Sequence, residues 1–351
     1  METVVRLMRR AMEEGVFPGA VLLGALAGEI RFLEAFGLAR LSPPRPVTRD
    51  TVFDLASLTK PLATAASCMA LASAGRFDPD RALGSVLPDF AGTPRETVTL
   101  AQVLGHTAGF PDWRPWFEEL LPLPPGERPA RLHRLLVQEP LAYAPGERTV
   151  YSDPGYLALQ WVLTHGLNKD LSAIAREWVF TPLGIRDLTF LPPAFPVPAT
   201  TETDPETGRF LEGRVHDDNA RALGGVAGHA GLFGTARGVF DLVSALLSAF
   251  AGETVPGFSP AVVREFLTRR PGPGGFVLGF DTPTPPSSSG TRFPPGSVGH
   301  LGFTGTSFWA NPSTGAVIVL LTNRVHPTRE NQAIRTFRPV IHDALMKAMG
   351  G

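Results

Sequence analysis

The stretch FDLASLTKPLATAASCMALASAG (residues 53–75) decides the fold, because almost every position from 57 to 74 is apolar or small. A helix that is apolar on all its faces belongs in the middle of a domain, so we expect residues 57–74 to form a buried helix. Pro61 fits its first turn, where backbone N–H groups have no partner within the helix. Gly75 is suited to end the helix, because glycine tolerates the left-handed conformation common after helix C-termini.

Ser57 and Lys60 lie one helical turn apart in this stretch and therefore share one face of the helix. A serine at a helix N-terminus lies in a positive partial field beside free N–H groups, which favours an alkoxide. Burial lowers the pKa of a lysine, so Lys60 is expected to exchange protons with Ser57. The alternative is a capping serine followed by a surface lysine. However, Lys60 is the only lysine in a helix that is expected to be buried, which favours a catalytic role for it.

Two further segments carry residues suited to chemistry. Tyr151 precedes a helical pattern, and a neighbouring cation such as Lys60 would favour its phenolate, so it can act as a base or proton shuttle. The alternative is a tyrosine that packs at a turn. The run 300–306 (HLGFTGT) is a strand interrupted by glycines, which indicates either the close approach of a ligand or a bulge. The common hydrolase elbow, zinc-protease and P-loop motifs are absent from the sequence.

The order of patterns along the chain predicts the architecture. An N-terminal helix is followed by a hairpin of two strands at 19–25 and 30–36, and helices such as 129–138 and 154–167 dominate residues 76–235. Strand patterns return at 275–280, 298–310 and 315–322, before a final helix at 329–349. We therefore expect an α/β fold of the α+β type, with a mixed, mainly antiparallel sheet built from both chain ends and flanked by helices. Residues 1–56 plus 236–351 would form the sheet subdomain and 57–235 a mostly helical one, with the active-site cleft between them.

Composition excludes several classes of function. The 351 residues include 32 Lys and Arg against 33 Asp and Glu, a net charge of −1, so no nucleic-acid partner is expected. The longest apolar stretch, 61–74, is too short for a membrane span, and the charged N-terminus is unlike a signal peptide, so a cytoplasmic protein is expected. The single cysteine, Cys68, excludes an intrachain disulfide and is expected to be a small buried hydrophobe. The oligomeric state stays open.

Taken together, S-x-x-K at 57–60, Tyr-Ser-Asp at 151–153 and His-Leu-Gly at 300–302 resemble the S-x-x-K, Y-x-N and K-T-G motifs of the serine β-lactamase and penicillin-binding-protein superfamily. The nearest pattern is that of class C β-lactamases and their esterase and D-peptidase relatives. Additional phrases at 104–109 (LGHTAG), 215–220 (VHDDNA) and 228–231 (GHAG) are similar to this group.

The resemblance implies a class C β-lactamase-like fold and acyl transfer without cofactor or metal. Ser57 would be the nucleophile, Lys60 its proton partner and Tyr151 the general base. The backbone N–H groups of Ser57 and Phe303 would form the oxyanion hole.

Departures from the family pattern bear on the substrate. Where the family motif has lysine and threonine, this chain has His300 and Leu301. A permanent cation is thus replaced by an imidazole that is partly protonated near neutral pH, and a hydroxyl by an apolar side chain. Asp153 places an acceptor-only anion where the family often has asparagine. The four candidate substrate-binding residues are Asp153, His300, Gly302 and Thr304, the last as a replacement hydroxyl. We interpret the cluster 216–218 (HDD) as pocket wall or loop scaffold and His106 as structural.

These observations favour a serine hydrolase that acts through a covalent acyl-enzyme, most simply a carboxylesterase or amidase on small neutral or amine-bearing substrates. The first alternative is a D-amino-acid peptidase or carboxypeptidase, or a weak β-lactamase. The second is a non-catalytic ligand-binding homologue, which would have no reason to bury Lys60.

Overall fold

The computed structural model describes residues 1–192, 196–204 and 207–350. Its strands form two sheets, and their bounds are β1 Gly19–Leu26, β2 Glu29–Arg40, β3 Arg45–Pro46, β4 Phe53–Asp54, β5 Leu188–Phe190, β6 Leu232–Gly234, β7 Val298–Leu301, β8 Ser307–Asn311 and β9 Ala316–Thr322. The α-helices are α1 Glu2–Glu13, α2 Ala66–Ser73, α3 Leu83–Val86, α4 Leu100–Leu104, α5 Phe117–Leu120, α6 Arg128–Gln138, α7 Asp153–Leu167, α8 Leu171–Ala175, α9 Asp218–Ala222, α10 Ala236–Ala251, α11 Pro260–Leu267 and α12 Ile334–Met349.

The larger sheet combines the two ends of the chain. Its strand order is β3-β2-β1-β9-β8-β7, and each described pair of neighbours is antiparallel. The predicted N-terminal hairpin is confirmed as β1 and β2, and β1 pairs directly with β9, so residues about 300 positions apart are joined (Ala20 with Thr322). The expectation of a mainly antiparallel sheet built from both chain ends is therefore confirmed.

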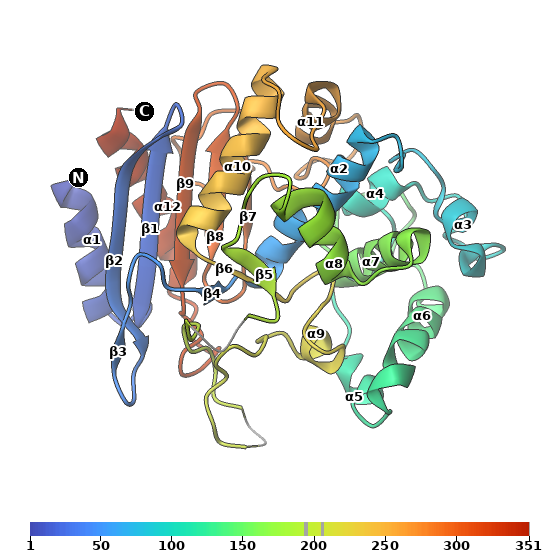
Figure 1. Cartoon of the computed structure of the whole chain (residues 1–351), viewed down its shortest axis with the longest axis horizontal. Coiled ribbons are helices and arrows are strands. Elements are labelled where there is room, and N and C mark those ends of the chain that lie inside the picture. Colours follow the sequence, from blue (N-terminus) through green and yellow to red (C-terminus); the bar gives the residue numbers. More distant parts are fainter. Residues whose placement is uncertain (193–195, 205–206, 351) are drawn as a thin grey trace.

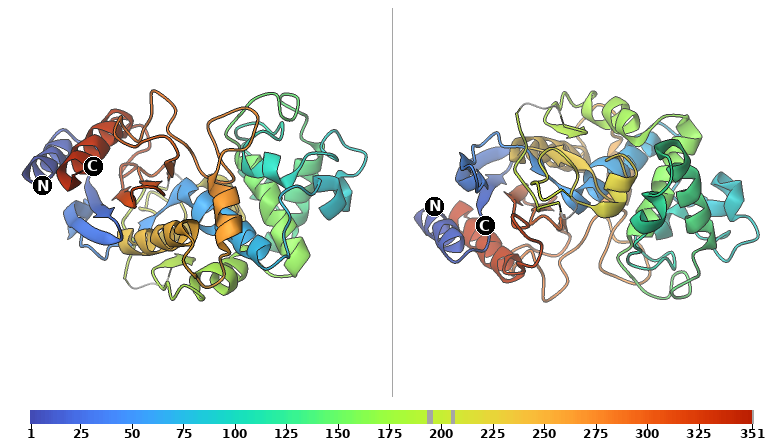
Figure 2. Two further views of the ribbon diagram at one scale, coloured as in Figure 1. Left: turned by 90° about the horizontal axis from the view of Figure 1, so that it is seen from above. Right: turned by 90° about the horizontal axis from the view of Figure 1, so that it is seen from below.

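Helices cover both faces of this sheet, and the alternation of side chains explains how. On β1, Leu22 packs with the helices α1 and α12, whereas Val21 and Leu23 belong to the larger core on the opposite face, where α10 lies. Figure 2 shows α1 and α12 side by side at one end of the molecule, with both chain termini there. Because successive strand residues point to opposite faces, a strand apolar at every position fits a sheet covered twice.

The helical part lies beyond α10 and contains the predicted buried helix (Figure 1). Side chains from 58 to 71 are buried, Cys68 among them, but the backbone is not one regular helix. A 3₁₀ turn at Ala56–Leu58 leads into a π-helical turn at Lys60–Ala65 and then into α2. In the described part of the chain, no helix is long and apolar enough to cross a membrane.

Three C-terminal predictions need correction. The run 275–280 is not a strand, because Gly275 and Gly279 have φ of +117° and +98° and bend the segment into a loop. The run 298–310 is two strands, β7 and β8, that a tight turn joins. The last helix begins at Ile334, because the carbonyl groups of Arg329 and Asn331 accept hydrogen bonds from Arg324 and are held outside a helix.

Candidate active site

The backbone before Ser57 is held in an unusual conformation. Ala56 has a φ of +48°, which is rare for a residue with a Cβ, and its N–H donates to Asp54 Oδ1 at 2.8 Å. Such strain persists only where the surroundings hold it and is common at functional sites. Ser57 follows in the first turn of the 3₁₀ helix, where N–H groups have no partner within the helix. The short strand β4 thus delivers the predicted nucleophile to the surface of a cavity.

Lys60 is completely buried and directed at Ser57. Its Nζ lies 3.1 Å from Ser57 Oγ, donates to the carbonyl oxygen of His229 at 3.1 Å and lies 2.6 Å from Asp153 Oδ1. The ring of Tyr151 is 4.6 Å from Nζ. Burial lowers the pKa of Lys60, whereas the carboxylate of Asp153 raises it, and burial prevails. The structure thus brings Ser57, Lys60, Tyr151 and Asp153 together as the sequence indicated.

Asp153 is not the free anion that the sequence suggested. It begins α7, after Ser152, whose side chain caps that helix by accepting from the N–H of Gly155 at 3.1 Å. From there its carboxylate is paired with the ammonium group of Lys60. An anion already paired in this way acts on Lys60 before it acts on a substrate.

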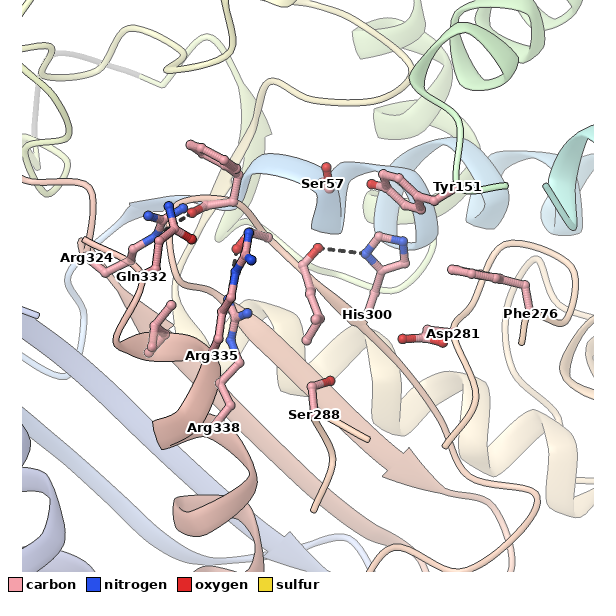
Figure 3. Close-up of a pocket in the computed structure, with 14 residues that line it drawn as sticks. Ser57, Tyr151, Phe276, Asp281, Ser288, His300, Arg324, Gln332, Arg335 and Arg338 are labelled. Atoms are coloured by element: carbon pink, nitrogen blue, oxygen red, sulfur yellow. Dashed lines mark hydrogen bonds between the residues drawn. The ribbon is translucent and has the colours of Figure 1, made fainter. Parts of the chain in front are cut away.

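Tyr151 faces Ser57 across the cavity, as Figure 3 shows, and its hydroxyl is directed at the Ser57 side chain. Burial raises the pKa of Tyr151 well above its ordinary value, and the charge of Asp153 raises it further. The structure therefore favours a neutral phenol in the resting site, rather than the phenolate expected beside a cation. His106 holds this loop, since its Nδ1 accepts from the N–H of Ser152 at 3.0 Å and its ring lies 4.8 Å from that of Tyr151.

The turn between β7 and β8 supplies the second predicted oxyanion donor. The N–H of Gly302 donates to Thr306 O at 2.7 Å, and in the described residues the N–H of Phe303 has no acceptor. A Cβ at Gly302 would lie 2.6 Å from the carbonyl oxygen of Leu55, so only glycine lets this turn approach the nucleophile. Thr304 does not fit its predicted substrate role, because its buried hydroxyl donates to Asp54 O at 2.8 Å.

Two cavities meet at Ser57, Tyr151 and Phe303. The larger, of about 500 Å³, extends along the sheet, and the smaller, of about 320 Å³, extends toward α9. Besides the three shared residues, the larger is lined by polar groups from three segments, namely Asp281, Ser288, His300, Arg324, Gln332, Arg335 and Arg338. The smaller is lined by Ala56, Trp113, Asp153, His216, Asp217, Asp218, Ala230 and Arg329.

His300 differs from the half-titrating imidazole that the sequence suggested. Its Nδ1 lies 2.9 Å from the carbonyl oxygen of Leu301 and must donate to it, which leaves Nε2 as an acceptor (Figure 3). That Nε2 is buried and has no partner in the described residues. Burial, aided by the charge of Lys60, lowers the pKa of His300 to about 3, so the ring is neutral near pH 7.

Sequence reasoning missed the arginines of the larger cavity. Arg335 and Arg338 lie three positions apart on α12, so the helical spacing was a signal that they share a face. Arg338 is buried and donates to the carbonyl oxygens of Gly302 and Thr306, both at 2.9 Å, which fixes the oxyanion turn. Arg335 is exposed, and within the described ranges its guanidinium has no hydrogen bond or ion pair.

Asp217 lines the smaller cavity as the interpretation of 216–218 as pocket wall indicated, but its contact with His229 was missed, because only the fold brings the two residues together. His229 Nε2 lies 2.8 Å from Asp217 Oδ1, which also accepts from the N–H of Ala220 at 2.7 Å. Asp153, Asp217 and His229 have donor atoms within 4.8 Å of one another, an arrangement that resembles a metal site. The ammonium group of Lys60 already provides the cation against Asp153, so we assign no metal to it. His216, which bonds Glu202 and Asp54, is a wall and scaffold residue as predicted.

A serine at a strained helix start, a buried lysine one turn on and a facing tyrosine are the arrangement expected of a serine acyl-transfer site. The family model described as Beta-lactamase matches residues 4–341, and the chain therefore belongs to the β-lactamase family. It is a serine hydrolase with the class C β-lactamase-like fold, as the motifs indicated.

The proteins that are similar to this chain carry the names of different activities. A protein of Escherichia coli (strain K12) named "Putative D-alanyl-D-alanine carboxypeptidase" is 29% identical over 345 residues, which cover 88% of this chain and 79% of that protein. A structure described as a class C β-lactamase superposes with a TM-score of 0.78 at 19% identity, over 100% of this chain and 96% of the other. EstCE1, described as a hydrolase with promiscuous acyltransferase activity, gives a TM-score of 0.75 at 24% identity, over 96% and 98%.

Proposed function

We propose that this chain cleaves small esters or amides through a covalent acyl-enzyme on Ser57. The observation that carries the proposal is the 3.1 Å approach of the buried Lys60 Nζ to Ser57 Oγ, at the edge of a cavity of about 500 Å³. As Ser57 Oγ bonds to the carbonyl carbon, Lys60 takes the hydroxyl proton. The backbone N–H groups of Ser57 and Phe303 stabilise the oxyanion. Tyr151 then moves protons to the leaving group and from the water that releases the acid.

The walls of the two cavities support neutral or amine-bearing substrates. The neutral ring of His300 lines the larger cavity and offers no positive charge to a carboxylate, so it suits an uncharged part of the substrate. In the smaller cavity, the carboxylate of Asp217 suits an amine on the acyl group. A carboxylesterase or an amidase fits both walls.

One observation favours a second candidate, hydrolysis of D-amino-acid peptides with a free carboxylate or weak hydrolysis of β-lactams. Arg335 projects toward the larger cavity with no ion pair in the described residues, and an unpaired guanidinium is suited to a carboxylate. The names of the carboxypeptidase relatives support the same candidate.

A substrate panel distinguishes the two. The purified chain is offered p-nitrophenyl acetate and butyrate, D-alanine p-nitroanilide, a peptide ending in D-Ala-D-Ala, and nitrocefin, and kcat/KM is compared. We expect the short esters to be turned over much faster than nitrocefin or the peptide. Comparable values for an ester and nitrocefin would favour the second candidate.

A fluorophosphonate probe tests whether the chain is an enzyme at all. Mass spectrometry should find one adduct, on Ser57. A folded chain that neither reacts with the probe nor hydrolyses any member of the panel would instead be a ligand-binding homologue.

A further inference from the structure

The surroundings of Lys60 fix where its lone pair must appear. Three groups contact Nζ, namely Ser57 Oγ, the carbonyl oxygen of His229 and Asp153 Oδ1, at 3.1, 3.1 and 2.6 Å. The carbonyl oxygen of His229 only accepts hydrogen bonds and keeps one N–H of Lys60 in either protonation state, and the carboxylate of Asp153 faces Nζ as its ion-pair partner. The third direction points at Ser57. It carries an N–H in the ammonium form and the lone pair in the amine form, and only the amine can take the Ser57 proton.

Asp153 is the anion in contact with Lys60. The other titratable groups facing Lys60 are Asp217 before α9, His106 after α4, His300 on β7, and the rings of Tyr151 and Tyr156 at 4.6 and 5.6 Å. Asp217 acts from farther away, with Oδ1 already bonded to His229 and to the N–H of Ala220. His300 is held neutral by burial, as described above, and burial also lowers the pKa of His106. The charge that opposes loss of the Lys60 proton therefore comes chiefly from Asp153.

We propose that Asp153 is a positioning residue that holds Lys60 as an ammonium ion in the resting enzyme and thereby sets the pH at which Ser57 is activated. The inference rests on the proposed role of Ser57 as nucleophile. An asparagine would offer Lys60 the same acceptor oxygen without the charge. The aspartate therefore leaves the geometry of Lys60 as it is and moves activity to higher pH.

The proton balance is simple. As the pH rises, the Lys60 ammonium loses one proton to water and becomes an amine that still donates to His229 O and lies against Asp153. The amine then takes the proton of the Ser57 hydroxyl while Ser57 Oγ forms its bond to the carbonyl carbon. Burial lowers the pKa of Lys60 and the Asp153 charge raises it, so removing that charge lowers it further.

The test is the pH profile of kcat/KM for Asp153→Asn on p-nitrophenyl acetate from pH 5 to 9, because this parameter reports the free enzyme. We expect the acidic limb to move down by about one unit or more, the usual effect of a contacting opposite charge. Asp218→Asn is the matched control. Asp218 lines the same cavity but is paired with Arg221 and Arg329, so its variant should keep the wild-type limb.

A second background assigns the titration to Lys60. Asp153 also raises the pKa of Tyr151, so the shift is measured again with Tyr151→Phe present in both enzymes. The shift should persist there. If it disappears, Tyr151 is the titrating group and the proposal is wrong.

Each remaining outcome of this experiment also supports or overturns the proposed role of Asp153. An acidic limb that stays in place or moves up in folded Asp153→Asn overturns the proposal. If that variant does not fold, Asp153→Ser removes the same charge with a residue that the first turn of α7 tolerates, and the same downward shift is required of it. Failure of the proposed function gives a different result, since Ser57→Ala would then hydrolyse the ester like the wild type.

Discussion

The charged and polar groups on the two sides of the active site are arranged differently. We call the side with Lys60, Asp153, Asp217 and His229 the helical wall, and the side with Asp281, His300 and Arg335 the sheet wall. On the helical wall, Lys60 is paired with Asp153, and Asp217 with His229. On the sheet wall, His300 Nε2 has no partner and Arg335 has no ion pair in the described part of the chain. Pairing fixes a buried charge in one geometry, which suits groups that must act on every turnover. Unpaired groups are available to the substrate, so the helical wall is where we expect chemistry and the sheet wall recognition.

The strongest test of this division is Ser57→Ala, which removes the Ser57 hydroxyl group that lies between the helical wall and the sheet wall. Ester hydrolysis should fall by more than a hundredfold while the thermal unfolding temperature stays near that of the wild type. Ser67→Ala is the matched control, because Ser67 lies on the same helical segment with a buried hydroxyl that has no partner in the structure. It should keep the activity. Retention of more than about a hundredth of the rate in Ser57→Ala would remove the nucleophile from the proposal.

Within the helical wall, Lys60 and Tyr151 should act as one unit. Lys60→Ala and Tyr151→Phe should each lower kcat by about 10²–10⁴, the usual contribution of general acid–base catalysis. Because both side chains face the Ser57 hydroxyl, the double variant should be little worse than the poorer single one. Four kcat values on one ester decide the point. Strictly multiplicative losses would mean that the two residues act independently.

The sequence predicted the parts of the fold that depend on neighbouring residues. It did not predict the parts that depend on contacts between distant segments. Local sequence patterns predicted the hairpin β1–β2 and the buried helix. The structure contains the hairpin, and the buried segment is helical, although it is a 3₁₀ turn, a π-helical turn and α2 in succession. The run 275–280 was misread as a strand, since an apolar stretch with two glycines has the same local signal whether it pairs or bends. The π-helical turn that carries Lys60 has no local signal in the sequence either.

The site divides in the same way. The spacing of Ser57 and Lys60 on one turn predicted their contact, and the family resemblance added Tyr151. The ion pair of Lys60 with Asp153 and the neutrality of His300 depend on burial by distant segments, which a single sequence does not display. Such long-range burial turned an expected free anion into a partner of Lys60 and an expected half-charged ring into an acceptor.

On the sheet wall, Arg335→Ala should sharpen the distinction between recognition and chemistry. An exposed guanidinium that contacts a carboxylate contributes on the order of 1 kcal/mol, so KM for a carboxylate-bearing substrate should rise about fivefold to tenfold. KM for p-nitrophenyl acetate, which has no carboxylate, should not change, and kcat should be unaffected for both. Arg31→Ala, which removes an exposed arginine on β2, is the control. A loss of kcat on the neutral ester would place Arg335 in the machinery instead.

The smallest expected effect concerns Asp281, the buried carboxyl of the sheet wall. Burial raises the pKa of Asp281 to about 7, against about 3.9 for an ordinary aspartate, and the N–H of Thr282 only partly offsets this. Between these two values the folded state binds more protons than the unfolded state, so the group lowers stability as the pH rises from about 4 to 7. Asp281→Asn has no such titration. Its free energy of unfolding relative to the wild type should therefore increase from pH 5 to pH 8, by about 1–3 kcal/mol.

Urea unfolding of both proteins at pH 5 and pH 8 measures this difference directly, and Asp50→Asn at an exposed position should show no change between the two pH values. The trend itself is decisive, because a carboxylate stabilised by a cation has a pKa below about 3.9 and would give no change between pH 5 and pH 8. If the difference in stability between Asp281→Asn and the wild type is the same at both pH values, then Asp281 is ionised and partnered in the folded protein throughout this range. The sheet wall would then be paired like the helical wall, and the division between chemistry and recognition would rest on Arg335 and His300 alone.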